Sequence, residues 1–319
     1  MKVLVSLNIP EIGVEMLRDQ GFEVTLWSND LPMEYTELLE AAKEHDILLS
    51  SSIYKIDRNF LESNKHLKLI SQFAAGYNNI DLKSASEFNI PIANTPGAMT
   101  DATADIAFAL MMAVSRKMFY MHKQISAGNW THFRPKANLG IELKGKTVGV
   151  LGMGRIGAEF AKRCAGAYNM KVIYHNRRQN KDAEKALGAR FVSFDELLAQ
   201  SDVLSVHAAL TEETREIFDS AAFEKMKPSA IFINAARGGI HNEKDLIDAL
   251  HNKAIWGTGL DVTNPEPMHQ DNPLLQMENV AVLPHIGSAT IEARDEMSRL
   301  AAFNIIQFSR GENLSNQVG

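Results

Sequence analysis

Short apolar runs alternate with amphipathic segments along the chain, a pattern that indicates strands alternating with helices. The predicted strands of the first part are Lys2–Leu7, Phe22–Trp27, Asp46–Ser50, Leu67–Gln72 and Ile90–Ala93, with helices near 11–20, 34–44, 57–64 and 81–88. Those of the later part are Thr147–Leu151, Lys171–His175, Val203–His207, Ala230–Asn234, Ile255–Leu260 and Val280–Leu283. This alternation predicts an α/β fold with two doubly wound parallel sheets.

Three segments stand outside the alternation. A long apolar helix is predicted from Thr100 to about Tyr120, and its run AFALMMAVS covers more than one helix face. Residues 127–145 contain Gly, Pro and Asn and show no clear period, so we predict a loop there. A last helix is predicted over about Ile291–Ser309.

Composition narrows the class of protein. The 319 residues are 45% hydrophobic and 23% charged, which is typical of a globular protein of about two domains. The net charge is −6 and no Lys/Arg cluster exceeds the pair Arg177–Arg178, so we expect no nucleic-acid partner. The longest apolar run, Ile106–Val114, is shorter than the ~20 residues of a membrane helix, so we expect no membrane association.

Cysteine and histidine usage bears on the compartment and on metals. Cys164 is the single cysteine, and the first ten residues read as a strand rather than as a signal peptide. We therefore expect a cytoplasmic protein. The scattered histidines have no metal-ligand spacing, so we expect no metal site.

A glycine-rich turn follows the first strand of the later part. Residues 147–157, TVGVLGMGRIG, place Gly152, Gly154 and Gly157 in the pattern G-x-G-x-x-G. In a dinucleotide site the first glycine permits a tight turn, the second lets the backbone approach a pyrophosphate, and the third lets helix and strand pack closely. A helix starting near Arg155 directs free N–H groups at the phosphates. The turn therefore predicts a Rossmann cofactor domain.

An overlapping motif offers a different nucleotide. Residues 140–147, GIELKGKT, match the phosphate loop G-x-x-x-x-G-K-[ST]. Such a loop opens a helix, whereas Lys146 and Thr147 lead into a predicted strand. We interpret the match as accidental and keep ATP hydrolysis as an alternative.

The residues after the second strand of this domain bear on which dinucleotide binds. An acidic residue that binds the ribose 2′-OH of NAD belongs about 20 residues beyond the turn. Asn176 occupies this position and is followed by Arg177 and Arg178. A neutral residue with two guanidinium groups suits a 2′-phosphate, so we predict a preference for NADP(H). The alternative is that both arginines are solvated and that NAD(H) also binds.

Three segments that follow later strands each carry a chemically useful residue. They are INAARGG (233–239), LDVTNPEP (260–267) and LPHIGSAT (283–290), which contain Arg237, Glu266 and His285. An arginine can bind a carboxylate through two hydrogen bonds and polarise an adjacent carbonyl. A histidine can donate and accept a proton, and a glutamate beside it holds its tautomer and favours its charged form. Together these three residues form a candidate catalytic set.

With these motifs the chain resembles the D-isomer-specific 2-hydroxyacid dehydrogenase family. The resemblance covers nearly the whole chain and is carried by AAGYNNID (74–81), NTPGAMTDATAD (94–105), GKTVGVLGMGRIG (145–157) and the three later segments. It is nearest to the glyoxylate/hydroxypyruvate reductases, partly because Arg177 falls where NADPH-using members carry a basic residue.

The resemblance implies roles for individual residues. Arg237, Glu266 and His285 take the catalytic positions, and Arg237 and His285 also contact the substrate. The backbone amides around Ala75 and Gly76 receive the substrate carboxylate. The implied cofactor contacts, beyond the glycines and residues 176–178, are Thr103, Arg155, Ile156, Ala208, Ala235, Ala236 and Asp261, of which Asp261 meets the nicotinamide amide.

The resemblance also implies an architecture. Residues 1–98 and 290–319 form a flavodoxin-like substrate domain, into which the Rossmann cofactor domain, residues 99–289, is inserted. The substrate is expected in a cleft between them, with hinges near Pro96 and Ser288. The apolar helix from Thr100 is expected to be buried in a homodimer contact, with a fully intramolecular core as the alternative.

The function implied is the NAD(P)H-dependent reduction of a small 2-oxo acid, of the glyoxylate/hydroxypyruvate type, to the D-2-hydroxy acid. The nicotinamide supplies the hydride and His285 the proton. One alternative is a dehydrogenase for another 2-hydroxy acid, such as lactate, 2-ketogluconate or phosphoglycerate. Another is a dinucleotide-sensing interaction protein without enzymatic activity, because a fold does not fix a function.

Overall fold

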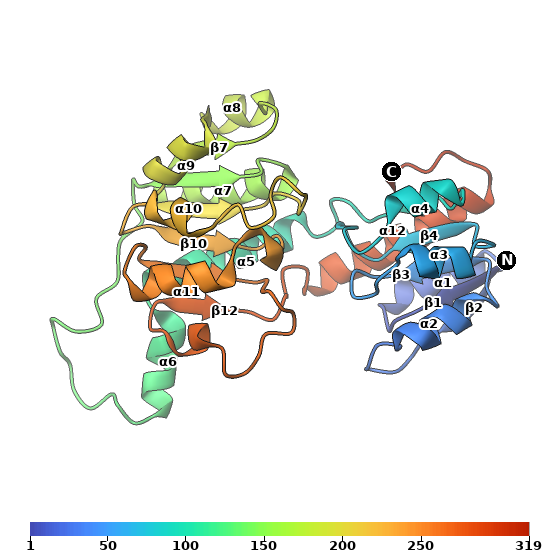
Figure 1. Ribbon diagram of the computed structural model, residues 1–319, viewed down its shortest axis with the longest axis horizontal. Helices are drawn as coiled ribbons and strands as arrows, with labels where there is room; N and C mark the ends of the chain where they lie inside the picture. Colours follow the sequence, from blue (N-terminus) through green and yellow to red (C-terminus); the bar gives the residue numbers. More distant parts are fainter. Residues whose placement is uncertain (319) are drawn as a thin grey trace. The chain divides into compact units, whose positions relative to one another are not determined.

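The computed structural model describes residues 1–318, which divide into two compact units. One unit contains Met1–Met99 and the segment from Ser288 onward, and the other contains Thr100–Gly287. Each unit is built around its own parallel sheet (Figure 1). The prediction of two α/β domains with parallel sheets is therefore confirmed.

The first unit contains a six-stranded sheet in the order β13-β5-β4-β3-β1-β2. The five parallel strands give the flavodoxin-like order, and the sixth, β13, pairs antiparallel with β5 at the edge. The strands are β1 (Lys2–Val5), β2 (Glu23–Leu26), β3 (Ile47–Ser50), β4 (Leu69–Gln72), β5 (Ile92–Ala93) and β13 (Gln317–Val318). Every residue of β3 and β4 is buried, and so is every residue of β1 except Lys2, as expected for strands that are covered on both faces.

Helices cover both faces of this sheet. The long helix α12 packs against α1, β3 and β4 on one face, and the apolar residues of α2, α3 and α4 belong to the core on the other face. The bounds are α1 (Glu11–Asp19), α2 (Tyr35–Ala42), α3 (Arg58–Ser63), α4 (Leu82–Glu87) and α12 (Ile291–Ser309). Because α12 follows residues 100–287 in the sequence, the second unit is inserted between the two parts of the chain that form the first unit.

The second unit contains a seven-stranded parallel sheet in the order β12-β11-β10-β9-β6-β7-β8. Numbered from β6, this is the 3-2-1-4-5-6 order of a Rossmann domain with one further strand. The strands are β6 (Thr147–Leu151), β7 (Lys171–His175), β8 (Arg190–Phe191), β9 (Val203–Val206), β10 (Ile231–Asn234), β11 (Gly257–Leu260) and β12 (Val280–Val282).

Two hydrophobic clusters pack on the two faces of this sheet. Residues of α5, α7 and α8 belong to one cluster, and residues of α9, α10 and α11 belong to the other. The helices are α5 (Thr100–Ser115), α6 (Met118–Ser126), α7 (Arg155–Tyr168), α8 (Lys181–Leu187), α9 (Phe194–Gln200), α10 (Ser220–Glu224) and α11 (Glu243–His251), with 3₁₀ turns η1 (Gly238–Ile240) and η2 (Pro273–Gln276).

Side-chain caps explain where several of these helices begin. Each capping oxygen accepts a hydrogen bond from the amide of the third helical residue, which satisfies a donor that has no partner within the helix. The caps of this kind are Asp57, Asp81, Asn180, Ser193, Asp219, Asn242 and Thr290. α7 is an exception, because its cap is Gly154 and makes no side-chain hydrogen bond.

The long apolar helix differs from its prediction. It ends at Ser115, because Lys117 adopts a left-handed conformation with φ +54°, and α6 begins at Met118. Within its own unit, α5 packs against α7 and against β10, β11 and β12. Its apolar faces are therefore largely covered by the chain itself, in accordance with the intramolecular alternative, whereas α6 has no buried residue.

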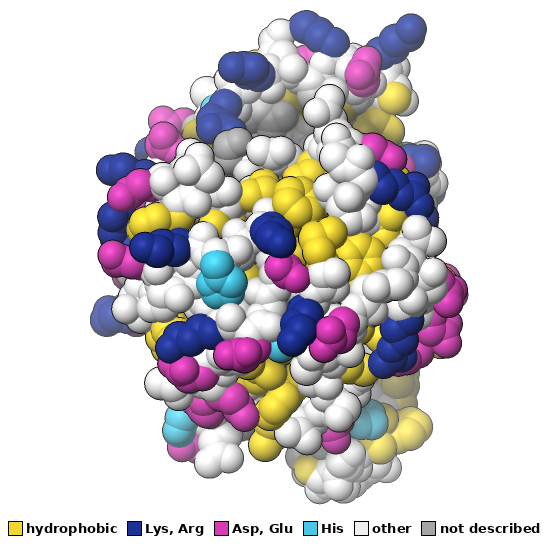
Figure 2. Space-filling view, turned by 90° about the vertical axis from the view of Figure 1, so that its right-hand side faces the viewer, with side chains coloured by type: hydrophobic (Ala, Val, Ile, Leu, Met, Phe, Trp, Pro, Cys, Tyr) yellow, Lys and Arg dark blue, Asp and Glu magenta, His cyan; other side chains and the backbone are white. Residues whose placement is uncertain are grey.

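On the face shown in Figure 2, lysine and arginine side chains lie among aspartate and glutamate side chains, without a continuous patch of either sign.

Of the helices within residues 1–318, none combines the length and the apolar character that crossing a membrane requires.

Candidate active site

The three candidate catalytic residues follow three neighbouring strands. Arg237 follows β10, Glu266 follows β11, and His285 follows β12. These strands are adjacent and parallel, so their carboxyl ends lie at one edge of the sheet. A Cβ atom at Gly238 would overlap the carbonyl of Thr263, so the loop that carries Arg237 packs directly against the loop that carries Glu266.

Glu266 and His285 form a close pair. His285 Nδ1 lies 3.0 Å from Glu266 Oε2, and the backbone N–H of Thr263 donates to Glu266 Oε1 at 2.9 Å. Burial raises the pKa of Glu266, but the hydrogen bonds from His285 and Thr263 and the charge of Arg237 outweigh it and leave this pKa below its usual value. Glu266 is therefore an ionised carboxylate that holds His285 through Nδ1, which leaves Nε2 for a substrate.

A buried aspartate fixes the loop that carries His285. Asp261 Oδ1 accepts from the amide of Ile286 and Oδ2 from that of Gly287, both at 2.8 Å. The amide of His285 donates to the Asp261 carbonyl at 2.9 Å, and Thr103 Oγ1 donates to the Gly287 carbonyl at 3.0 Å. These bonds support the left-handed backbone of His285, which has φ +54°.

The environment of Asp261 differs from what the sequence indicates. The residue is 1% exposed, and burial raises the pKa of its carboxyl group, while the hydrogen bonds from the amides of Ile286 and Gly287 and the charge of His285 oppose this rise. Sequence analysis gave Asp261 only a contact with the nicotinamide. The structure adds a positioning role, because both carboxylate oxygens hold the segment after His285.

A second brace holds the loop that carries Arg237. Asn234, at the end of β10, accepts from the Ala236 amide at 3.0 Å and donates to the Arg237 carbonyl at 2.9 Å. Its Nδ2 also lies 3.0 Å from His241 Nδ1, and burial lowers the pKa of His241 to about 4, so this ring is a neutral acceptor. Sequence analysis missed Asn234 and His241. The sequence offered one signal for them, which is that both are polar residues close to Arg237, one before it and one after it.

Arg237 itself is half-buried. Its Nη1 donates to the Ala236 carbonyl at 2.7 Å. Burial lowers the pKa of its guanidinium group, while the charge of Glu266 raises it. A guanidinium group remains charged under these conditions, so the loop presents a cation beside the Glu266–His285 pair.

The glycine-rich turn has the geometry that a dinucleotide requires. Gly152 has φ +94°, and a Cβ atom there would lie 2.5 Å from the amide nitrogen of Ala208. A Cβ atom at Gly157 would lie 2.9 Å from Val150 Cγ1, so α7 packs closely on β6. A Cβ atom at Gly154 would meet nothing within 4 Å, so this glycine faces open space. The turn thus contains the open position that a pyrophosphate needs next to backbone.

The start of α7 supplies the donors for such a pyrophosphate. Within residues 1–318, the amides of Arg155, Ile156 and Gly157 have no acceptor, because the first intrahelical bond runs from Ala158 to the Gly154 carbonyl. Unpaired N–H groups and the helix dipole attract anions at this end. The residues present therefore fit a dinucleotide.

The alternative phosphate loop does not have the required form. Residues 140–146 are irregular, and Thr147 begins strand β6 instead of a helix. The amide of Lys146 donates to the Leu143 carbonyl within the same turn. GIELKGKT therefore lacks the helix N-terminus that directs a phosphate loop's amides at its ligand.

The predicted ribose-binding residues divide into two groups. Asn176 Oδ1 accepts from the Met153 amide at 2.6 Å, so its side chain binds the glycine-rich turn. Arg177 and Arg178 are exposed, and neither forms an ion pair within the described residues. Ala208, Ala235 and Ala236 are half-buried at the ends of β9 and β10.

The predicted carboxylate-binding residues belong to the other unit. Ala75 and Gly76 are half-buried in the loop after β4.

Metal ligands were not predicted, and within residues 1–318 no three histidine, cysteine, aspartate or glutamate side chains cluster in a way that would hold an ion.

Comparison with known proteins decides the family. Residues 108–287 match the family described as "D-isomer specific 2-hydroxyacid dehydrogenase, NAD binding domain". Glyoxylate reductase from Thermococcus litoralis is 42% identical over 99% of this chain and 96% of its own length. The chain belongs to the D-isomer-specific 2-hydroxyacid dehydrogenases. Like other members of the family, this dehydrogenase is an oxidoreductase that uses a nicotinamide dinucleotide and acts on a small 2-oxo or 2-hydroxy acid.

Solved structures agree with this assignment. A protein from Thermus thermophilus superposes on this dehydrogenase with a TM-score of 0.92, at 36% identity, over 100% of both chains. A glyoxylate reductase from Paecilomyes thermophila superposes with a TM-score of 0.88, at 37% identity, over 100% of this chain and 98% of its own. The predictions of the family, of the fold and of an enzyme that reduces a small 2-oxo acid are confirmed.

Proposed function

We propose that this dehydrogenase reduces glyoxylate or hydroxypyruvate to the D-2-hydroxy acid, with NADPH as the preferred reductant. The observation that carries the proposal is the Glu266–His285 pair at 3.0 Å, next to Arg237 and in the same unit as a glycine-rich turn with an open centre. The names of its relatives support glyoxylate as the substrate.

His285 is the proposed proton donor. Its Nδ1 is held by the ionised Glu266, so the proton available for transfer is on Nε2. When bound, the reduced nicotinamide supplies the hydride that reaches the carbonyl carbon. The proton from Nε2 reaches the carbonyl oxygen, and His285 is left neutral until solvent reprotonates it.

Arg237 is the proposed partner of the charged part of the substrate. Its guanidinium binds the carboxylate and stabilises negative charge that develops on the carbonyl oxygen. The backbone amides near Ala75 and Gly76 are a second proposed contact for the carboxylate. In this proposal, residues 1–98 and 290–319 form the substrate domain and residues 99–289 form the dinucleotide domain.

Steady-state rates with a panel of small 2-oxo acids test the substrate. Glyoxylate and hydroxypyruvate should give higher kcat/KM values than pyruvate, 2-ketogluconate or a phosphorylated 2-oxo acid, as followed by absorbance of the reduced nicotinamide. A higher value for any of the last three would assign the enzyme to that substrate instead.

The preference for NADPH rests on two exposed arginines. Arg177 and Arg178 follow β7 and have no ion-pair partner within residues 1–318, so both can pair with a 2′-phosphate. Replacing both with serine should lower kcat/KM for NADPH about ten-fold or more and leave that for NADH nearly unchanged. Lys171→Ser, at the opposite end of β7, is the matched control. A wild-type preference for NADH would refute this part of the proposal.

A homodimer is proposed from α6 and the segment that follows it. Figure 1 shows this segment extending away from the body of its own unit. It carries Trp130 and Phe133, which are 75% and 85% exposed, and α6 exposes Ile125. Large apolar side chains that are exposed together mark interaction surfaces. We therefore assign the contact to this region rather than to α5.

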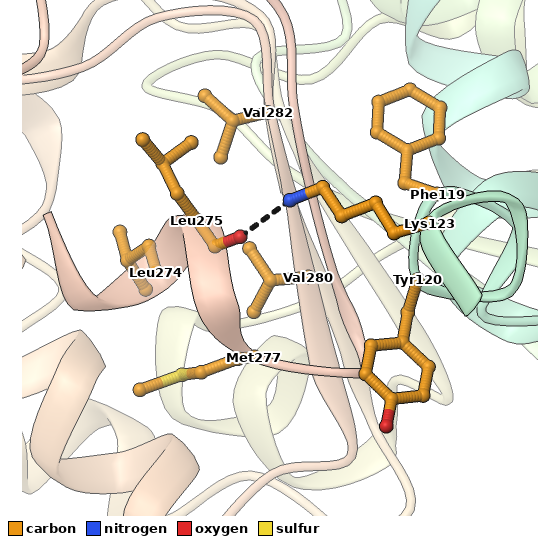
Figure 3. A pocket seen from close by; sticks show the side chains of 8 residues that line it. All are labelled: Phe119, Tyr120, Lys123, Leu274, Leu275, Met277, Val280 and Val282. Carbon is orange, nitrogen blue, oxygen red and sulfur yellow. Dashed lines mark hydrogen bonds between the residues drawn. The ribbon is translucent and has the colours of Figure 1, made fainter. Parts of the chain in front are cut away.

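A pocket of about 250 Å³ lies beside α6 (Figure 3). It is lined by Phe119, Tyr120, Lys123, Leu274, Leu275, Met277, Val280 and Val282. Lys123 Nζ donates to the Leu275 carbonyl at 2.7 Å across it. None of the three catalytic candidates lines this pocket.

The solution mass tests the dimer. Light scattering should give twice the mass of the chain for the wild type, and Phe133→Asp should shift the protein toward the monomer. Ile53→Asp, which changes an exposed apolar residue of the other unit, should not. A monomeric wild type would contradict the dimer.

A cytoplasmic location is also proposed, because it suits the single cysteine. Cys164 is buried within α7, and burial raises the pKa of its thiol, which therefore stays protonated. A protein with no disulfide partner suits a reducing compartment. Cell fractionation would test this, and recovery with secreted proteins would contradict it.

A further inference from the structure

The backbone of the loop after β4 is held by hydrogen bonds to its carbonyl oxygens. Three successive carbonyls each accept a hydrogen bond from a donor at the end of β4 or just after β5: Ala74 from the amide of Thr95 at 3.0 Å, Ala75 from Asn94 Nδ2 at 2.7 Å, and Gly76 from Gln72 Nε2 at 3.2 Å. All three donor residues are at least nine-tenths buried. The loop is therefore fixed through its carbonyl oxygens.

Fixing a carbonyl also fixes the amide that shares its peptide plane. In a trans peptide the N–H and C=O groups point in opposite directions, and the peptides of this loop are trans. The N–H groups of Ala75, Gly76 and Tyr77 therefore point away from the residues that hold the carbonyls. Within residues 1–318, none of these three N–H groups has an acceptor.

Unpaired backbone N–H groups can donate to an anion. Ala75 and Gly76 are half-buried and Tyr77 is exposed, so the site is open to a ligand from one side. Its donors are backbone amides, which can receive the oxygens of a small carboxylate.

The two side-chain donors are themselves held in place. Gln72 Nε2 also donates to Asn79 Oδ1 at 2.7 Å, and Asn79 Nδ2 donates to the Tyr54 carbonyl at 2.7 Å. The backbone of Asn94 is fixed independently of its side chain, because its amide donates to Asn316 and its carbonyl accepts from Asn304 Nδ2. Truncation of the Asn94 side chain should therefore release the Ala75 carbonyl and leave the strand end in place.

We infer that Asn94 and Gln72 are positioning residues for substrate binding, which keep the amides of Gly76 and Tyr77 free for the carboxylate contact that the proposed function places at this loop. The inference rests on the proposed function, since it takes a 2-oxo acid as the ligand. Neither side chain needs to touch the substrate. Each acts by keeping a carbonyl turned toward the strand ends, so that the amide on its far side is free for the carboxylate.

Steady-state kinetics of Asn94→Ala test the inference. The KM for the 2-oxo acid should rise about three- to ten-fold, while kcat and the KM for the cofactor stay close to wild type. Asn64→Ala is the matched control, because Asn64 is a fully buried asparagine of the same unit whose Nδ2 donates to the Leu39 and Phe60 carbonyls, away from this loop. An equal rise of KM in both variants, or no rise in Asn94→Ala, would overturn the inference.

A second measurement applies if Asn94→Ala does not fold. In wild-type enzyme labelled with ¹⁵N-glycine, with the oxidised cofactor present, oxalate should shift the Gly76 amide signal, which is assigned by its loss in Gly76→Ala. Inhibition by oxalate without this shift would contradict the inference. Failure of the wild type to reduce any 2-oxo acid would instead refute the proposed function, and the oxalate titration would still report on the loop.

Discussion

Asp261 holds the segment His285–Gly287 through both its backbone carbonyl and its carboxylate. The amide of His285 donates to the Asp261 carbonyl at 2.9 Å, and the carboxylate accepts the next two amides of the chain. The end of β11 therefore determines where the histidine after β12 lies. A proton donor on a loop is useful only if its ring nitrogen is held within hydrogen-bond reach of the substrate.

Asp261→Asn should lower kcat strongly and change the free energy of unfolding only a little. An asparagine offers one acceptor where the carboxylate offers two, and its NH₂ group would face a backbone N–H group. Because a small misplacement of a catalytic group can be costly, we expect kcat to fall by about 100-fold. Turnover and the Kd of the cofactor should be measured together. A higher Kd of the cofactor with unchanged kcat would mean that Asp261 contacts the nicotinamide and does not position the His285 loop.

His285→Ala should nearly abolish reduction. Loss of a general acid costs about 10²- to 10⁴-fold in rate. The Kd of NADPH, measured by fluorescence, should change little, since the unpaired amides of the glycine-rich turn are in another part of the unit. His66→Ala, at an exposed histidine of the other unit, is the control. Normal turnover without His285 would require another proton donor.

Glu266→Gln should lower kcat and leave the Kd of the cofactor nearly unchanged. The pKa of Glu266 lies below its usual value, because the hydrogen bonds from His285 and Thr263 outweigh the effect of burial. A glutamine can still accept from His285 Nδ1, but a neutral amide makes a weaker hydrogen bond than a carboxylate and holds the ring less firmly. We expect kcat to fall about ten-fold or more. A kcat equal to that of the wild type would contradict this role for Glu266.

Two histidines of the dinucleotide-binding unit, the buried His241 and the half-buried His207, should make it acid-sensitive. Burial lowers the pKa of His207 to about 3 and that of His241 to about 4, from the usual 6.5. As pH falls below about 6.5, the unfolded chain takes up protons that the folded chain cannot, so the free energy of unfolding falls. Each histidine contributes a slope of up to about 1.4 kcal/mol per pH unit.

Urea unfolding at a series of pH values measures this slope. His241→Gln keeps an acceptor near Asn234 and does not titrate, so its slope between about pH 6 and pH 5 should be smaller than that of the wild type by about 1.4 kcal/mol per unit. An unchanged slope in His241→Gln would show that His241 is protonated in the folded protein.

The parts of the fold and site that the sequence predicted depend on local patterns. The strands carry apolar runs, and Arg237, Glu266 and His285 each follow such a run, so their common edge could be inferred from parallel pairing alone. The short edge strands β8 and β13 were missed because two residues show no periodicity.

The parts that were missed depend on contacts between distant residues. The helix break at Lys117 lies in a helical pattern, but the Lys117 ammonium pairs with Glu278 at 3.2 Å and lies 5.3 Å from the Trp256 ring centre. Asn176 has the spacing of a ribose ligand, yet its side chain is bound to Met153. Spacing along the chain does not determine the direction of a side chain.

The burial of Cys164 has a practical consequence. Because it is the chain's single thiol and lies inside its unit, maleimide dyes should not react with the folded wild-type protein. One cysteine introduced on the surface of each unit would therefore carry a fluorophore pair without prior removal of native thiols. Energy transfer between the two dyes would then report, in single molecules, whether the distance between the units changes when substrate and cofactor are added.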